Sequence, residues 1–198
     1  MLFRSCSAHS YMGNAIQTHG STVVDGRHDV SPNNTVPVHS LSGIGTETNI
    51  DVALVPKGTG AILGNIPDGT ATGGNKRGAY AVDLQLNRSS AGQVASGQYS
   101  AIVGGNNNST SAVESFIGGG TDNSIGSSAD DSAIVGGTAN IASAPDSFIG
   151  GGSGNSINGG ADASVIIGGT YNNIDFAYVD CAIVGGSNNE CDFYSSNV

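Results

Sequence analysis

Six copies of one nine-residue sequence motif, called the phrase below, recur in the second half of the chain, between Ser100 and Asn189. Each copy has a small polar residue or Cys, an apolar residue, Ile, a fourth residue, Gly-Gly and, three positions later, Asn. Successive copies begin 15, 17, 15, 17 and 17 residues apart. Such self-similarity is typical of repeat proteins, in which each unit covers the bare face of its neighbour. It predicts an all-β fold, a parallel β-roll or β-solenoid of 15–17-residue coils over residues 95–198.

Three features of the phrase are expected to define the coil. The Ile should face the interior, the Gly pair should form a tight corner, and the Asn should either adopt a left-handed backbone conformation or form an amide ladder between coils. The Ile residues, the first glycine of each pair and the Asn residues are Ile102, Ile117, Ile134, Ile149, Ile166, Ile183, Gly104, Gly119, Gly136, Gly151, Gly168, Gly185, Asn108, Asn123, Asn140, Asn155, Asn172 and Asn189.

The second and fourth positions of the phrase compensate one another in volume in most copies. Ala in the second position occurs with Val in the fourth in three copies, and Phe occurs with Gly in two, whereas Val165 with Ile167 is the exception. Alternate residues of a strand face opposite sides, so both positions lie on the side opposite to Ile. Because close packing balances volumes, we expect this second face to be buried against another copy of the chain. The expected oligomer interface comprises Val103, Phe116, Val135, Phe148, Ile167 and Val184.

Charge is distributed unevenly along the sequence. All six Lys and Arg residues precede residue 89, where six acidic residues balance them. Ten acidic residues follow and supply the formal net charge of -10. An acidic surface repels phosphate backbones, which argues against nucleic acid as a partner. No apolar run approaches the ~18 residues of a membrane helix, and the N-terminus lacks the pattern of a signal peptide, so we expect no membrane insertion.

The chain before the repeats falls into two parts. Residues 1–45 contain all four His residues and suggest no regular element, so we expect an irregular attachment segment. Residues 46–94 form a β-rich connector in which two β-like runs, 50–55 and 61–66, flank a Pro-Lys-Gly-Thr-Gly turn. Residues 95–198 are the Gly-rich repeat domain.

The three Cys residues do not make a disulfide framework. Cys181 and Cys191 are expected to be small buried thiols, since free Cys is usually buried. The alternative is a bridge across one coil, which needs an oxidising compartment. Cys6 and His9 have the spacing of half a metal site, but the other half is missing. We therefore predict no metal and no cofactor.

The repeats SAIVGGNNN, SFIGGGTDN, SAIVGGTAN and SFIGGGSGN resemble the head repeats of trimeric autotransporter adhesins. The preceding segment, with DVALVPKGTGAI and GGNKRGAYAVDLQLNRSSAGQVASGQYSAI, is similar to bacteriophage and related viral tail-fibre sequences. The resemblance implies a homotrimer and a structural fibre or spike subunit of a virion, with other virion proteins bound through the N-terminal region. Its host partner would be a surface glycan or protein. The alternative is the head of a bacterial adhesin on the cell surface.

Aromatic and acidic residues gather in the last two coils, where they suit sugar binding because rings stack on sugar faces and carboxylates accept hydroxyl hydrogen bonds. The candidate receptor-binding residues are Tyr171, Asp175, Phe176, Tyr178, Asp192 and Phe193. The competing interpretation is loop packing at the end of the roll.

Acidic residues also precede the repeated strands, where solvated turn carboxylates are expected, with bound calcium as the alternative. Polysaccharide cleavage, as in depolymerising tail spikes, would need a carboxylate pair, for which Asp130 with Asp131, or Asp175 with Asp192, are the candidates. No paired-carboxylate cleft is signalled, so we predict no catalytic residues and a protein that is not an enzyme.

Overall fold

The computed structural model describes residues 27–29, 38–40, 53–175 and 179–192 of the 198-residue chain. The chain divides into two compact units, Met1–Ala53 and Leu54–Val198. In the first unit, β1 (Arg27–Asp29) pairs antiparallel with β2 (Val38–Ser40), and His28 lies opposite His39. The sequence analysis assigned no element there, because a three-residue strand is too short to show an alternating pattern.

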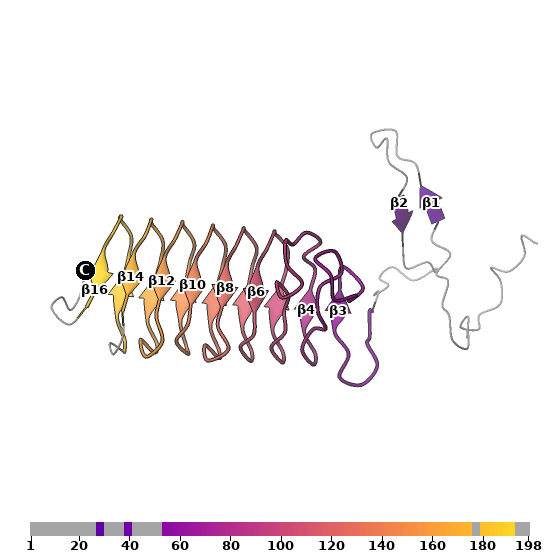
Figure 1. Ribbon diagram of the computed structural model, residues 1–198, viewed down its shortest axis with the longest axis horizontal. Helices are drawn as coiled ribbons and strands as arrows, with labels where there is room; N and C mark the ends of the chain where they lie inside the picture. The colour runs from indigo at the N-terminus through magenta and orange to yellow at the C-terminus, as the bar shows by residue number, and fades with distance from the viewer. Residues whose placement is uncertain (1–26, 30–37, 41–52, 176–178, 193–198) are drawn as a thin grey trace, which may run out of the picture. The chain divides into compact units, whose positions relative to one another are not determined.

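The second unit is a parallel β-solenoid built from strands of two residues each (Figure 1). Its larger sheet has eight strands, of which neighbouring members pair in parallel. They are β3 (Ile62–Leu63), β4 (Val82–Asp83), β5 (Ala101–Ile102), β7 (Phe116–Ile117), β9 (Ala133–Ile134), β11 (Phe148–Ile149), β13 (Val165–Ile166) and β15 (Ala182–Ile183). The predicted solenoid fold is therefore confirmed.

A six-stranded parallel sheet forms another side of each coil. It comprises β6 (Ser109–Thr110), β8 (Ser124–Ile125), β10 (Ile141–Ala142), β12 (Ser156–Ile157), β14 (Asn173–Ile174) and β16 (Glu190–Cys191). Between the two sheets, a line of single parallel bridges runs from Asn87 through Thr138 to Ser187. Each of the six coils from β5 onward thus contributes one strand to each sheet and one bridge between them, whereas the coils of β3 and β4 contribute a strand to the larger sheet alone.

The described part of the expected connector continues the solenoid. β3 pairs with β4, and β4 pairs with β5, the first strand of the repeats. β3 lies within the β-like run at 61–66, whereas residues 53–55 of the other run form no strand.

The solenoid interior is a narrow apolar column. All six repeat Ile residues are at most 1% exposed, as their position in the phrase predicted. The six-stranded sheet contributes a second inward column, which includes Ile125, Ala142, Ile157 and Ile174. Burying an Ile side chain stabilises the fold by about 1.5–3 kcal/mol, so these columns supply much of the hydrophobic stabilisation of each coil.

The ninth-position Asn residues form the amide ladder, one of the two arrangements that the sequence allowed. Asn140 Nδ2 donates to Asn123 Oδ1 at 3.1 Å, and Asn155 Nδ2 donates to Asn140 Oδ1 at 3.2 Å. The ladder spans successive coils and is fully buried from Asn108 to Asn172. The left-handed backbone conformation falls one position earlier, as at Asp122, whose φ is 57°.

Of the two corner glycines, the second one in the phrase is the constrained one. Gly137 has a φ of +89°, and a Cβ placed on it would lie 2.2 Å from the carbonyl oxygen of Gly152 in the next coil. A Cβ on Gly136, the first of the pair, would meet nothing within 4 Å. The need for glycine that the sequence analysis assigned to the pair therefore rests mainly on its second member in this coil.

Candidate functional site

The outer face of the eight-stranded sheet is apolar along its whole length. The second and fourth positions of the repeats lie there, opposite to the buried Ile column. Val103 and Val135 are 48% and 49% exposed, and Ile167 is 53% exposed. The apolar character extends into the first coils, where Leu84 is 42% exposed at the position that corresponds to Val103. We call the second and fourth positions of these eight strands the apolar face.

The outer face of the six-stranded sheet has a different character. Its outward positions are mostly polar: Ser109, Ser124, Ile141, Ser156, Asn173 and Glu190. The hydroxyls of neighbouring strands interact there, with Ser109 Oγ donating to Ser124 Oγ at 3.3 Å. The two sheets of one solenoid thus present chemically distinct surfaces, and only the larger sheet lacks polar side chains on its outer side.

The matched volumes on the apolar face have a cause within the single chain. A Cβ on Gly118 would lie 2.4 Å from the carbonyl oxygen of Val135 in the next coil and 3.3 Å from Cε1 of Phe116. The Phe116 ring therefore lies beside Gly118, and the next coil closes over the same position. Volume matching is thus explained without a partner chain. Any argument for a partner must rest on the solvent exposure of the apolar face.

Acidic residues occupy the turns that precede the larger sheet, as the sequence indicated. Glu114, Asp131, Asp146 and Asp180 are exposed and have left-handed backbone conformations, with φ between 55° and 61°. Backbone hydrogen bonds to the preceding coil hold these turns, as from Asp131 N to Val113 O at 3.1 Å. Within the described ranges, no three His, Cys, Asp or Glu side chains are grouped so as to hold a metal ion.

Part of the expected receptor-binding cluster lies outside the described residues, namely Phe176, Tyr178 and Phe193. Tyr171 is 63% exposed, and a Cβ on Gly154 of the preceding coil would lie 2.5 Å from its ring. Asp175 accepts a hydrogen bond from Asn158 Nδ2 at 3.3 Å.

Asp175 and Asp192 follow the paired residues Ile174 and Cys191, so they occupy equivalent positions in adjacent coils, as expected. The described members of the cluster, Tyr171 and these two carboxylates, thus all lie in the last two coils.

Cys181 and Cys191 form a disulfide bond, so the expectation of two free thiols is wrong. Cys181 replaces the buried first-position Ser at β15, and Cys191 takes the inward position of β16. The bond therefore crosses the interior of the last described coil, where the column of Ile side chains ends. The sequence could not decide between thiols and a bridge, because the distance across a coil is a property of the fold.

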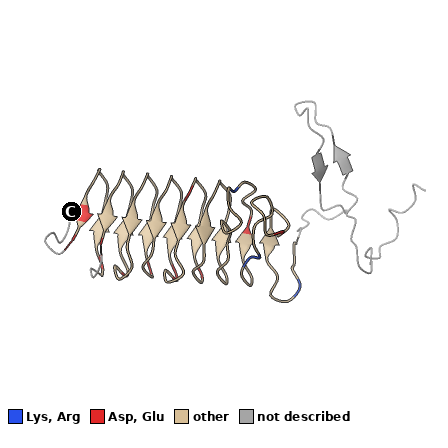
Figure 2. Cartoon of the chain, in the orientation of Figure 1, with Lys and Arg blue, Asp and Glu red and all other residues tan. Residues whose placement is uncertain are grey.

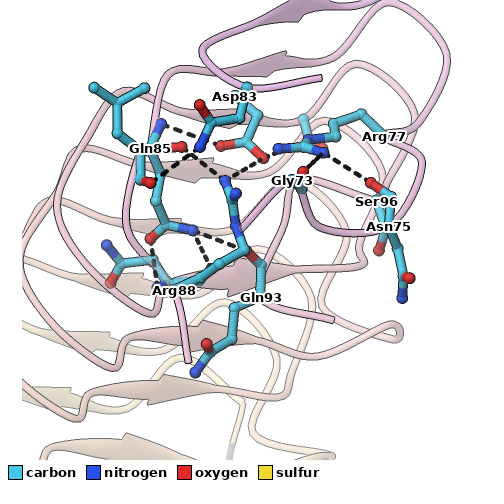
Figure 3. A network of polar contacts seen from close by, with 12 residues as sticks. Gly73, Asn75, Arg77, Asp83, Gln85, Arg88, Gln93 and Ser96 are labelled. Atoms are coloured by element: carbon cyan, nitrogen blue, oxygen red, sulfur yellow. Dashed lines mark hydrogen bonds and ion pairs between the residues drawn. The ribbon is translucent and has the colours of Figure 1, made fainter. Parts of the chain in front are cut away.

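A buried polar network lies at the opposite end of the solenoid, and the sequence analysis missed it (Figure 3). Asp83 occupies the inward position of β4 that Ile102 occupies in β5. Arg77 Nε donates to Asp83 Oδ2 at 2.7 Å, and Arg88 Nη2 lies 3.7 Å from the same oxygen. All three side chains are at most 1% exposed.

The same region begins the amide ladder. Gln85 Oε1 accepts the backbone N–H of Asn108 at 2.7 Å, just as Asn108 Oδ1 accepts that of Asn123 at 3.0 Å. Gln85 thus replaces the missing Asn of the preceding coil. The available sequence signal was the segment Ala81–Val82–Asp83–Leu84, which aligns with the start of the phrase but has Asp where the phrase has Ile.

Electrostatics in this network reflect its burial. Burial lowers the pKa of Arg88, and the charge of Arg77 lowers it further, whereas the carboxylates of Asp83 and, to a smaller extent, Asp68 oppose these effects. At the surface nearby, hydrogen bonds from the backbone and the hydroxyl of Thr70 lower the pKa of Asp68. The network holds the first coils together.

Comparison with known proteins finds no matching family model, no matching curated protein and no matching solved structure. None of the described segments forms a helix that is long and apolar enough to cross a membrane. The apolar face, the C-terminal carboxylates and the N-terminal polar network are therefore interpreted from their own chemistry.

Proposed function

We propose that the chain is a structural fibre or spike subunit of a virion, whose solenoid assembles as a homotrimer through the apolar face. The observation that carries the proposal is the contrast between the two sheets. One sheet presents a continuous apolar surface, and the other presents mainly hydroxyl and amide groups. Extended apolar surfaces on soluble proteins mark interaction sites.

Identical chains are the partners that best fit this face. The apolar positions repeat coil by coil along the solenoid, so a parallel copy offers the same spacing and the same residue at each level. Around a three-fold axis, the three Phe116 side chains would meet at one level. The three Phe148 side chains would meet at a second level, two coils further along. Burying these half-exposed side chains would stabilise the trimer by about 25 cal/mol for each Å² of apolar surface removed from water.

The assembled solenoid would present its remaining polar surfaces to the host. Three identical chains give each weak contact three copies, which raises overall affinity without a deep pocket in any one chain. The host partner is a surface glycan or protein, and the carboxylates and aromatic residues of the last two coils are the candidate contacts. The residues before the solenoid would attach the fibre to other virion proteins.

The disulfide bond supports a location outside reducing compartments. Disulfides persist on virions and cell surfaces but are rare in the cytosol, where thiols are kept reduced. This observation fits the virion and also fits the alternative, the head of a trimeric adhesin on a bacterial surface. Immunogold labelling with antibodies to the solenoid distinguishes the two, because it places the label either on virus particles or on cells.

The mass of the purified full-length chain in solution tests the assembly. Light scattering after size exclusion should give three times the chain mass of 19.6 kDa. The double substitution Phe116→Asp with Phe148→Asp should give the mass of a single folded chain, because six carboxylates would otherwise be buried together at the axis.

Ile141→Asp is the matched control for this experiment. Ile141 is 43% exposed on the outer face of the six-stranded sheet, comparable with the 39% of Phe116. The control should remain trimeric. A monomeric wild-type chain would contradict the proposal, as would a double variant that still forms the trimer.

A further inference from the structure

A cavity of about 560 Å³ lies at the N-terminal end of the solenoid, between the turn that contains Lys57, strand β3 and the loop from Lys76 to Ala79. Three cationic residues, Lys57, Lys76 and Arg77, contribute to its wall, and none of the residues that line it is acidic. Cavities that bind small ligands commonly measure about 300–1,000 Å³. The cavity therefore has the size of a ligand site and one sign of charge.

Arg77 joins this cavity to the buried polar network. Its Nε bonds to Asp83, and its Nη1 donates to the carbonyl oxygens of Gly73 at 2.6 Å and Asn75 at 2.9 Å. Its Nη2 is buried, and no hydrogen-bond partner for it exists among the described residues. A buried donor without an acceptor costs about 1–3 kcal/mol, so the positive charge of this guanidinium is incompletely compensated within the protein.

The network also carries an excess of positive charge. Arg77 and Arg88 share the single carboxylate of Asp83, and the three side chains are at most 1% exposed. Two guanidinium groups with one buried carboxylate leave one buried positive charge, which the surface carboxylate of Asp68 offsets only from outside the buried network. Buried charges are normally paired, because removing an ion from water costs several kcal/mol. An anion bound in the cavity would add a second counter-charge near Arg77.

We propose that this cavity is an anion-binding site that takes a sulfate or phosphate group, held by the ammonium groups of Lys57 and Lys76, while the buried guanidinium of Arg77 adds positive potential from behind the cavity wall. Oxyanions of this kind suit such a set, since charged N–H donors make the strongest hydrogen bonds to anionic oxygens. The volume exceeds that of a free ion, so the cavity has room for a group attached to a sugar. The site is independent of the proposed fibre role.

The charge distribution confines anion binding to this end of the described solenoid. Its Lys and Arg residues lie around β3 and β4, whereas Asp and Glu occur on turns along the remaining coils and on β16 (Figure 2). An anionic ligand would be repelled by the acidic coils and attracted to the cavity. We therefore expect one saturable site for each chain rather than diffuse binding along the solenoid.

Calorimetric titration of the full chain with sodium sulfate and with sodium phosphate, at constant ionic strength, tests the proposal. The wild-type chain should show saturable binding with one site for each chain. Lys57→Gln combined with Lys76→Gln should weaken binding at least tenfold. Arg77 is left unchanged, because its contact with Asp83 is part of the folded core.

Ser127→Glu combined with Ser128→Glu is the charge-matched control. Both Ser residues are exposed in a turn of the repeat domain, and the control lowers the net charge by the same two units as the lysine substitutions. It should bind as the wild type does. Equal affinity in the lysine variant, an equal loss in the control, or no saturable binding by the wild type would each overturn the proposal.

A third titration, with a sulfated disaccharide, separates the two sources of the anionic group. Affinity at least tenfold above that for inorganic sulfate would support the site and identify a sulfated glycan as the ligand. Equal affinity for both would support it and identify the free ion. Failure of all three ligands to bind would contradict the anion proposal. It would not affect the trimer proposal, which rests on the exposed apolar side chains of the eight-stranded sheet.

Discussion

The amide ladder provides the sharpest test of how the coils are held together, through the substitution Asn140→Ala. The Asn140 side chain is fully buried in the middle of the ladder. Its Nδ2 donates to Asn123 Oδ1, Gly136 O and Gly152 O, at 3.0–3.1 Å. Its Oδ1 accepts from the backbone N–H of Asn155 at 3.0 Å and from the side chain of Asn155 at 3.2 Å.

The magnitude follows from what the substitution leaves behind. The backbone N–H of Asn155 would lose its acceptor inside the solenoid, at a cost of about 1–3 kcal/mol. The remaining lost hydrogen bonds and the cavity left by the amide bring the expected total to about 3–5 kcal/mol. For a unit of this size, each kcal/mol shifts the melting temperature by about 2–4 °C, so we expect a decrease of roughly 6–20 °C.

Thermal unfolding followed by circular dichroism, at one chain concentration, measures this effect. Asn87→Ala is the matched control, because it removes the same amide from an exposed side chain. Asn140→Asp keeps an acceptor of similar volume but no longer donates to the two Gly carbonyl groups, so it should be at least as damaging at neutral pH. The reasoning would be refuted if Asn140→Ala melted within about 2 °C of the control.

Three further predictions follow from the described contacts. In chemical unfolding, Gly137→Ala should destabilise the fold by more than about 2 kcal/mol and Gly136→Ala by less than about 1 kcal/mol. Of the two, only Gly137 has a positive φ and a carbonyl oxygen 2.2 Å from the position of an added Cβ. Equal effects would contradict the corner assignment. Asp83→Asn should cost about 3–5 kcal/mol, because it leaves two buried guanidinium groups without a carboxylate; a change below 1 kcal/mol would show that the network is not structural. Thiol titration of the unfolded chain should give one reactive thiol before reduction and three after it, because Cys181 and Cys191 are bonded to each other. Three thiols in both samples would rule the bond out.

The repeat determined the parts of the fold that depend on local order. A strand exposes alternate residues to opposite sides, so the periodic Ile residues had to line one interior and the interval between them had to equal one coil. The same logic placed the second and fourth positions on the outer face. Local order did not determine which alternative each Asn would adopt, because a ladder exists only when neighbouring coils are in register.

The candidate sites depended far more on the tertiary structure. The sequence signalled Asp83 only as an Asp in the Ile position of the phrase, and it did not indicate its partners, since Arg77 and Arg88 come from separate loops that fold back over one carboxylate. The bond between Cys181 and Cys191 likewise required the two chain segments to meet across a coil. In each case the decisive distance joins residues that carry no shared periodic signal.

By itself, the sequence determined a parallel β-solenoid with an Ile interior, glycine corners and an acidic, Lys- and Arg-free repeat domain, because each of these is written in a period or a composition. Only the tertiary structure decided that Gln85 begins the ladder, that the second corner glycine is the constrained one at Gly137, and that a basic cavity lies at one end. These depend on how coils stack and loops close, which is set by contacts between distant residues.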